Sequence, residues 1–266
     1  MNYIQISITA TEVEQEILIS QLADLGATGF EQVETFLLAY FLEDDFQSYD
    51  VNVIIKNFEF QLNTLKDQNW NSLWESKFKP VIVNDFCAIR AHFHQPADDV
   101  QHEIIITPKM SFGTGHHATT FMMIQLMREL DFTNKSVFDF GTGTGILTIL
   151  AKKLGASFIT AIDVDEWSIT NALENLERNE IEGFNLYQSS ELPAEAYDIV
   201  LANINRNVLL EHSVRLKEIV KPKGMLLLSG LLKEDEKEIC LAFTIQGFQM
   251  VKRNEKQNWI CLLLAN

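Results

Sequence analysis

The most informative part of this chain is the stretch Lys135–Ala156, KSVFDFGTGTGILTILAKKLGA, which joins an apolar run, a glycine-rich turn and a helical pattern. The apolar run includes Asp139, and Gly141, Gly143 and Gly145 follow at alternate positions. Glycine lets the backbone adopt conformations that other residues avoid, and it lets the backbone approach a ligand closely. The stretch therefore predicts a strand, a ligand-binding turn and a helix, in that order.

The residues that follow the glycines exclude two common phosphate-binding motifs. A Walker motif ends in Gly-Lys-Ser/Thr, whereas Ile146 and Leu147 follow Gly145. The dinucleotide fingerprint G-x-G-x-x-G requires glycine at position 146, so it fails as well. The remaining pattern, D-x-G-x-G-x-G, places the carboxylate of Asp139 beside the turn and favours a cationic ligand. S-adenosylmethionine carries an ammonium and a sulfonium group and no phosphate, so it is the predicted cofactor.

Strand and helix patterns alternate around this turn. We expect strands at 136–140, 158–164, 184–188, 197–204 and 224–230, and helices at 119–130, 146–155, 167–179, 208–220 and 234–246. Such alternation predicts an α/β fold with a Rossmann-like, doubly wound parallel sheet. The final stretch, 247–265, reads as two strands without a helix between them, so a hairpin should complete a seven-stranded sheet whose last strand is antiparallel.

The first 67 residues predict a separate, small α+β domain. Thr11 and Glu14 have capping-box spacing, and Gly26 follows the helical pattern as a stop. The order of the expected elements, β-α-β-β-α-β, is ferredoxin-like. Residues 68–80 predict a linker helix with an aromatic stripe, and residues 81–266 the cofactor-binding domain.

Charge is distributed unevenly along the chain, whose net charge is −16. Residues 1–75 contain 13 acidic and two basic residues, a net charge of −11, and the other 191 residues carry −5. An acidic domain should repel a phosphate backbone and attract a basic protein, so we expect no direct binding of nucleic acid. A merely solvated acidic face is the alternative.

Three dispersed cysteines, Cys87, Cys240 and Cys261, form no CxxC pair and are typical of buried thiols in a reducing compartment. No apolar run approaches the roughly 18 residues of a membrane-spanning helix. The N-terminus lacks the basic start and long apolar stretch of a signal peptide. These features predict a cytoplasmic protein that does not enter a membrane.

Two acidic residues follow the second strand of the predicted sheet. Asp163 comes 22 positions after Gly141, at the edge of the sheet where both ribose hydroxyls of a nucleoside would be bound. Asp165 is better placed to cap the next helix. The segment after the third strand, QSSE (188–191), should border the adenine.

Two further segments belong to the predicted site. SFGTGHHATT (111–120) is a loop of glycines and hydroxyls suited to closing over a cofactor, and its two histidines have no further ligand at metal-binding spacing nearby. We therefore predict no metal. LANIN (201–205) places Asn203 where the fourth strand leaves the sheet, opposite the glycine turn, although asparagine at a strand end is often only a turn former.

Together these motifs resemble one family over nearly the whole chain, the ribosomal protein L-eleven (L11) methyltransferase family, PrmA, which methylates a large-subunit ribosomal protein. The resemblance covers the small N-terminal domain, NWNSLWESKFKP (69–80), FGTGHHATT, DFGTGTGIL, IDVD and ANI. It implies that Thr120, Gly141, Asp163 and Asn203 bind the cofactor, and the glycine pattern adds Gly143. The family usually has Asp-Pro before the loop and His-Pro-Thr-Thr within it. This chain has Thr-Pro (107–108) and His-Ala-Thr-Thr (117–120) instead.

The predicted reaction is N-methylation of a lysine or an α-amine. Only about 0.1% of a lysine with pKa near 10.4 is neutral at pH 7.4. Removal of water from the amine in a closed site should lower that pKa and free the lone pair. We expect the side-chain carbonyl of Asn203 to accept the amine hydrogens and direct the lone pair, and we identify no general base. Three alternatives are an RNA or DNA amino-methyltransferase, a dehydrogenase, which the residue after Gly145 disfavours, and a non-catalytic S-adenosylmethionine-binding protein.

Overall fold

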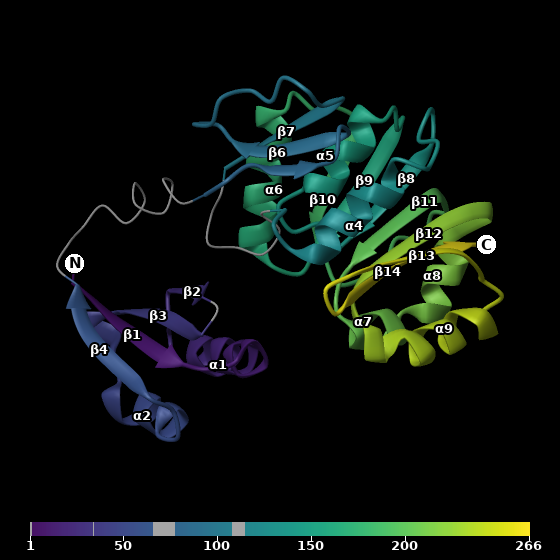
Figure 1. The fold of residues 1–266 in the computed structure, drawn as a ribbon. Helices are drawn as coiled ribbons and strands as arrows, with labels where there is room; N and C mark the ends of the chain where they lie inside the picture. Colours follow the sequence, from purple (N-terminus) through teal and green to yellow (C-terminus); the bar gives the residue numbers. More distant parts are fainter. Residues whose placement is uncertain (1, 34, 66–77, 108–114) are drawn as a thin grey trace. The chain divides into compact units, whose positions relative to one another are not determined.

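The computed structural model of this chain describes residues 2–33, 35–65, 78–107 and 115–266 (Figure 1). The chain divides into two compact units, Met1–Phe78 and Lys79–Asn266. Within the described ranges, no helix is both long and apolar enough to cross a membrane. The linker helix expected at 68–80 falls mainly on residues outside these ranges, so it stays a prediction.

The small unit is an antiparallel sheet packed against two helices. Its strands are β1 (Tyr3–Thr9), β2 (Gly29–Val33), β3 (Phe36–Leu42) and β4 (Phe60–Leu65), in the order β2-β3-β1-β4. The helices are α1 (Glu12–Asp24) and α2 (Ser48–Ile55). Alternate strand residues such as Ile6 and Ile8 form one buried cluster with Leu18 of α1 and Val51 of α2. The two-residue period of the strands therefore buries one face of the sheet under both helices.

The start of α1 follows the predicted capping box. The Glu14 carboxylate accepts hydrogen bonds from the Thr11 backbone N–H at 2.8 Å and from the Thr11 hydroxyl at 2.7 Å. Two donors at the helix N-terminus are thus paired with one side chain. Gly26, with φ 87°, follows the end of the helix in the left-handed conformation expected of a C-terminal glycine.

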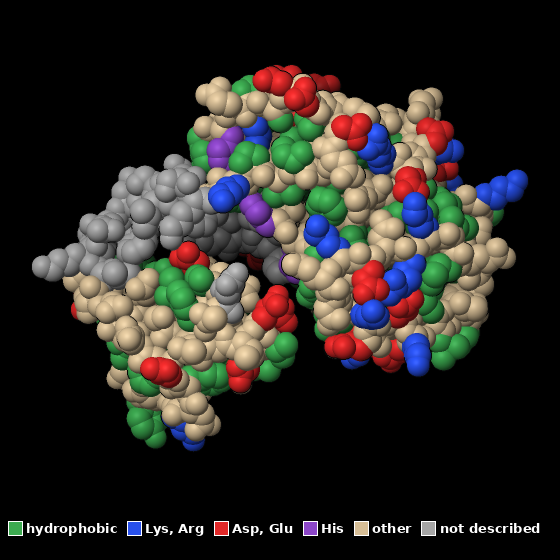
Figure 2. All heavy atoms as spheres, viewed as in Figure 1, with side chains coloured by type: hydrophobic (Ala, Val, Ile, Leu, Met, Phe, Trp, Pro, Cys, Tyr) green, Lys and Arg blue, Asp and Glu red, His purple; other side chains and the backbone are tan. Residues whose placement is uncertain are grey.

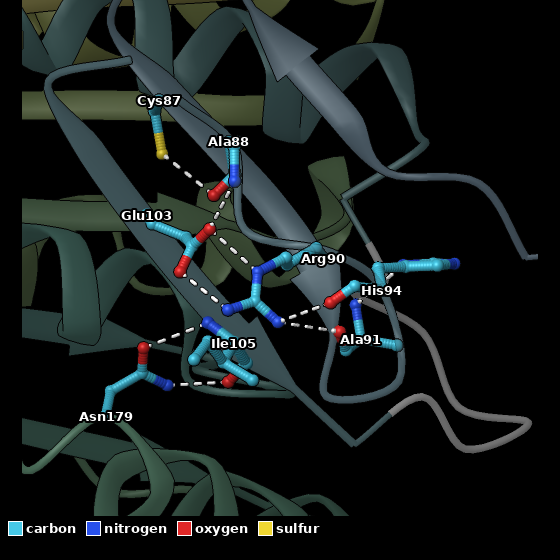
Figure 3. A network of polar contacts seen from close by, with 9 residues as sticks. Cys87, Ala88, Arg90, Ala91, His94, Glu103, Ile105 and Asn179 are labelled. Carbon is cyan, nitrogen blue, oxygen red and sulfur yellow. Dashed lines mark hydrogen bonds and ion pairs between the residues drawn. The ribbon is translucent and has the colours of Figure 1, made fainter. Parts of the chain in front are cut away.

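The large unit begins with a three-stranded sheet of its own. It contains β5 (Val81–Val83), β6 (Cys87–Ala91) and β7 (His102–Ile106), with β5 antiparallel and β7 parallel to β6. The apolar patterns FCAIRAHF (86–93) and EIIITP (103–108) predict the last two strands, whereas no pattern predicts Val81–Val83. Figure 3 shows the ion pair that joins the side chains of β6 and β7. The Arg90 guanidinium, which is buried, makes two bonds of 2.7 and 2.8 Å to Glu103.

A mixed seven-stranded sheet forms the centre of the large unit, in the order β10-β9-β8-β11-β12-β14-β13 (Figure 1). The strands are β8 (Ser136–Phe140), β9 (Phe158–Asp163), β10 (Phe184–Gln188), β11 (Tyr197–Asn203), β12 (Val220–Leu232), β13 (Gln249–Lys256) and β14 (Trp259–Ala265). The first five strands in this order are parallel. β14 runs antiparallel to β12, and β13 runs antiparallel to β14 at the edge.

Six helices of the described chain flank this sheet: α4 (Ala118–Met127), α5 (Ile146–Lys153), α6 (Glu166–Arg178), α7 (Arg206–Glu211), α8 (Ser213–Ile219) and α9 (Glu236–Ile245). Leu209, Leu216 and Phe243 of the last three helices share one buried cluster with strand residues such as Val200 and Leu228. Strands buried under helices in this way read as continuous apolar runs.

One prediction for this unit was wrong. The pattern at 208–220 predicts a single helix, but the structure has two helices, α7 and α8, separated at His212. The ring of His212 packs edge-on against Phe140, with 5.3 Å between ring centroids. Asn205 begins α7 by accepting a bond from the Val208 N–H at 3.1 Å. His212 thus lies between the two helices with its ring against β8, a contact that helical periodicity does not reveal.

Candidate active site

The glycine turn leaves β8 at the carboxyl edge of the seven-stranded sheet. Gly141, Gly143 and Gly145 have φ values of 73°, 55° and 80°, all in the left-handed region. The N–H groups of Gly141 and Thr142 both donate to the Ile162 carbonyl at 2.9 Å, which ties the turn to β9. Because side chains disfavour this backbone conformation, the alternate glycines are a structural requirement of the turn.

Asp139 lies wholly buried beneath the turn. Its Oδ2 accepts hydrogen bonds from the hydroxyls of Thr142 at 2.8 Å and Thr148 at 2.7 Å. Its Oδ1 has no hydrogen-bond partner within the described part of the chain. Burial raises the pKa of Asp139 to about 6, although the two threonine hydroxyls oppose that shift. An unpaired buried carboxylate oxygen is costly, so this atom marks a place where a polar or cationic group is favourable.

Asp163 ends β9 and faces the same turn. Its Oδ2 accepts the Gly143 N–H at 2.8 Å, and its Oδ1 accepts the Asp165 N–H at 3.1 Å. Each carboxylate oxygen has two lone pairs, so both retain capacity for a ligand hydroxyl. The prediction that Asp165 caps the following helix is confirmed, because its carboxylate accepts the N–H groups of Trp167 and Ser168.

Asn203 and Thr120 meet across the edge of the sheet from β11 and the first turn of α4. The Asn203 side-chain Nδ2 donates to the Thr120 hydroxyl at 3.4 Å, and the Thr120 side chain is buried. This contact directs the amide nitrogen toward α4 and leaves the amide oxygen Oδ1 as an acceptor for another group. The preceding part of the predicted loop, 111–114, lies outside the described residues.

Thr120, Gly141, Gly143, Asp163 and Asn203 all line one cleft of about 310 Å³. Further lining residues include Ser189, from the segment expected to border the adenine. The structure therefore brings together the five residues that the sequence selects, although they come from four separate segments of the chain. The cleft opens where the carboxyl ends of parallel strands meet, as ligand sites in doubly wound sheets do.

The two adjacent histidines have structural partners. His117 begins α4 and accepts the Thr119 N–H at its Nδ1, and its ring packs edge-on against Trp259 at 4.6 Å. Burial lowers the pKa of His117. The Nε2 of His116 lies 3.0 Å from the Lys79 carbonyl. Within the described ranges, no group of three or more histidine, cysteine or acidic side chains is arranged to hold a metal ion.

Sequence reasoning missed two asparagines, one in α6 and one at its C-terminal end, that hold neighbouring main chain in place. Asn175, which is buried, accepts the Thr107 N–H at 2.7 Å and donates to the Thr144 carbonyl at 2.9 Å. Asn179 makes both a donor and an acceptor bond to the main chain of Ile105 (Figure 3). These bonds connect β7 and Thr107, the residue that follows it, with α6 and the glycine turn. The sequence signal for this arrangement was the spacing of four positions between Asn175 and Asn179, which places both side chains on one face of a helix.

The class of protein follows from a solved structure of the same fold. The ribosomal protein L11 methylase from Lactobacillus delbrueckii subsp. bulgaricus superposes with a TM-score of 0.65 and 28% identity, covering 70% of this chain and 97% of that chain. The fold is therefore the α/β fold of a methyltransferase.

The family profile described as "Ribosomal protein L11 methyltransferase (PrmA)" matches residues 30–266. The ribosomal protein L11 methyltransferase of Porphyromonas gingivalis is 37% identical over 94% of this chain and 90% of its own length. That of Chlorobaculum tepidum is 35% identical over 99% of this chain and 96% of its own length. The chain belongs to the ribosomal protein L11 methyltransferase family.

Proposed function

We propose that this protein transfers methyl groups from S-adenosylmethionine to amino groups of ribosomal protein L11. Its membership of the family and the names of its relatives support the substrate. The observation that carries the proposal is the cleft at the carboxyl edge, where Asp163, the glycine turn and Asn203 meet. In this proposal the ribosomal protein is a basic partner, which suits the acidic N-terminal part of this chain.

The residues present fit this cofactor. Asp163 retains lone pairs for two ribose hydroxyls, and Ser189 lies where the adenine is expected. Gly141 and Gly143 expose main chain to the cleft, and the carboxylate of Asp139 lies beneath them with an unpaired oxygen. A negative charge at this depth favours a ligand that carries positive charge over a pyrophosphate. Thr120 and Asn203 complete the opposite side of the cleft.

When bound, S-adenosylmethionine supplies a methyl group already activated by the adjacent sulfonium. The chain must then align the amine and remove its hydration, and alignment alone is worth several kcal/mol in well-oriented reactions, up to about 10 kcal/mol. In our proposal the Asn203 Oδ1 accepts an amine hydrogen, and the bond from its Nδ2 to the Thr120 hydroxyl orients the carboxamide. The amine lone pair is thereby directed away from Asn203 and toward the cleft. Water carries the released proton.

We further propose the finer architecture implied by the topology. The strand order β2-β3-β1-β4 with two helices supports a ferredoxin-like small unit, and the order β10-β9-β8-β11-β12-β14-β13 supports a Rossmann-like, doubly wound sheet. The first domain (1–67) would recognise the substrate, and the last (81–266) would hold the cofactor. The three free cysteines, Cys87, Cys240 and Cys261, support a cytoplasmic location.

The charge of the small unit supports recognition of a basic protein and not of nucleic acid. On the face drawn in Figure 2, its charged side chains are mostly acidic, whereas the large unit shows both basic and acidic side chains. Lys56 is the one basic residue in 1–65. Because the Debye length falls from about 10 Å at 0.1 M salt to about 3 Å at 1 M, association with L11 should slow steeply with salt. Stopped-flow mixing with L11 measures this rate.

The function is tested by incubating the purified protein with labelled S-adenosylmethionine and either purified L11 or ribosomal RNA. We expect label on lysine or α-amino groups of L11 and none on RNA. Calorimetry should show binding of S-adenosylhomocysteine and none of NAD. Transfer to RNA alone would replace L11 as the substrate, and cofactor binding without transfer to either would indicate a non-catalytic protein.

A further inference from the structure

Ile204, the residue after Asn203, is packed between two glycines from distant parts of the chain. A Cβ placed on Gly141 would lie 2.3 Å from Cγ2 of Ile204. A Cβ placed on Gly230 would lie 2.3 Å from the carbonyl oxygen of Ile204, 2.7 Å from its carbonyl carbon and 3.0 Å from its nitrogen. Real Cβ atoms essentially never lie closer than 3.0 Å to such neighbours. Neither glycine can therefore carry a side chain while Ile204 keeps its position.

Gly230 lies in a β-bulge of β12. The pairing with β14 passes from Leu228 opposite Leu262 to Leu231 opposite Ile260, so two residues of β12 face one residue of β14. Gly230 has φ 82°, in the left-handed region. Bulges bend a strand and often lie beside active sites, where they redirect neighbouring groups. Here the bend brings the main chain of β12 against the residue that follows β11.

The same bulge fixes the main chain of Ile204 through a hydrogen bond. Asn203 is in register with Ser229, the residue before Gly230, and the Ile204 N–H donates to the Ser229 carbonyl at 3.2 Å. The Ser229 hydroxyl, which is buried, donates to the Ile260 carbonyl at 2.9 Å. Ile204 is thus held through its N–H, and Gly230 and Gly141 leave room for its carbonyl and its side chain, so the direction in which Asn203 leaves the sheet depends on this packing.

We propose that Gly230 is a positioning residue for methyl transfer, because its missing side chain lets the Ile204 main chain take the place that aims the Asn203 carboxamide. This inference rests on the proposed function, since it takes Asn203 as the group that aligns the amine. An added Cβ would meet main-chain atoms, so no rotation of a side chain relieves the contact. Ile204 must shift and carry Asn203 with it. A misplacement of about 1 Å costs a reaction about 100-fold in rate.

The test compares Gly230→Ala with a matched control, Gly247→Ala. Gly247 has φ 87°, nearly that of Gly230, but the nearest atom to its added Cβ would be Nζ of Lys217 at 3.4 Å. Both variants carry alanine in the left-handed region, so the strain of that conformation is shared. Single-turnover methylation of L11 is measured at saturating S-adenosylmethionine, well below both unfolding temperatures. We expect a loss of about 100-fold for Gly230→Ala and less than twofold for Gly247→Ala, with affinity for S-adenosylhomocysteine lowered less than tenfold in both.

A double-mutant cycle with Asn203→Ala separates positioning from general damage. If Gly230 acts through Asn203, Gly230→Ala causes no further loss once Asn203 is alanine. A full additional loss in that background, or equal rates for Gly230→Ala and the wild type, would overturn the inference. Should Gly230→Ala not fold, Ser229→Ala loosens the bulge without an added atom, and it should lose rate severalfold with the same dependence on Asn203.

A measurement without cofactor or substrate distinguishes failure of this inference from failure of the proposed function. The side-chain amide resonance of Asn203 is assigned in the NMR spectrum by its disappearance in Asn203→Ala. It should move in Gly230→Ala and stay in place in Gly247→Ala. A wild type that methylates nothing but shows this pattern would refute the proposed function alone. An active wild type whose Asn203 resonance is unaffected by Gly230→Ala would refute the positioning role alone.

Discussion

The small unit and the carboxyl edge of the large unit use polar side chains in opposite ways. At the carboxyl edge, Asp139 is buried with two hydroxyls on one oxygen, and both oxygens of Asp163 accept main-chain N–H groups. In the small unit, acidic side chains such as those of the short 3-10 helix Glu43–Asp45 are exposed to solvent. Side chains fixed by hydrogen bonds hold a site in one geometry, whereas exposed charges contribute to the electrostatic field that steers a partner. The first kind should tolerate no displacement, and the second should tolerate exchange of one acidic residue for another.

Removal of the small unit tests this comparison with the largest expected effect. A protein that begins near Asn69 should still bind S-adenosylhomocysteine with affinity within about twofold of the full chain, because the described cleft lies wholly within Lys79–Asn266. Methylation of L11 should become undetectable, because the proposed recognition surface is gone, and RNA should gain no label. Calorimetry measures the affinity for S-adenosylhomocysteine, and a filter assay with labelled cofactor measures methylation of L11 and RNA. Full activity on L11 would show that the acidic unit contributes nothing to recognition.

Asn203→Ala should lower kcat by about 100-fold, because an aligned amine matters most in the transition state. KM for L11 should change little. The matched control is Asn207→Ala, an exposed asparagine in α7 that does not line the cleft. Single-turnover kinetics decide the matter: an unchanged rate for Asn203→Ala would remove this residue from the mechanism.

Asp163→Ala should weaken S-adenosylmethionine binding by roughly 1.5–3 kcal/mol, the usual worth of hydrogen bonds to a charged group. Asp163→Asn keeps one carbonyl oxygen and should lose less. Titration calorimetry at constant ionic strength gives both affinities. Equal binding by the wild type and the alanine variant would place the ribose elsewhere in the cleft.

The buried carboxyl group of Asp139 should make the stability of the large unit depend on pH. Its pKa in the folded protein is raised by burial to about 6, so the folded chain keeps this proton between about pH 4 and pH 6 while the unfolded chain releases it. Stability that depends on Asp139 is therefore lost as pH rises through this window, and the burial penalty is fully present above it. Asp139→Asn does not ionise, so its unfolding free energy relative to wild type should rise by about 1 to 3 kcal/mol from pH 4 to pH 7. Denaturant titrations across this range measure the difference, and parallel profiles would contradict it.

Much of the site was predictable because its essential residues are close in sequence or have distinctive types. The pattern of Asp139, Gly141, Gly143 and Gly145 encodes a left-handed turn locally, and Asp163 ends a strand whose apolar pattern is plain. Parallel strands then bring such ends to one edge without further information. The mixed α/β fold follows from the same alternation.

The remaining features depend on contacts that no local pattern contains. Asn175 joins Thr107 to Thr144, across 68 and 31 positions, and on a helix it reads as one more polar residue. Gly230 reads as the end of a strand, and only its pairing with β14 reveals a bulge. The helical pattern is interrupted at His212, whose ring packs on Phe140, and no local pattern contains that contact.

The double use of Asp163 has an evolutionary consequence. The same carboxylate holds the Gly143 N–H of the turn and caps the backbone at Asp165, while it is also the proposed partner of the ribose. A substitution that altered ligand preference at this position would loosen the turn in the same step. A lineage drifting toward another nucleoside ligand would therefore first need a new support for the turn, for instance at Ser168 or Ser189, which line the same cleft. Until such a support arose, selection for a folded turn would keep the ligand preference unchanged.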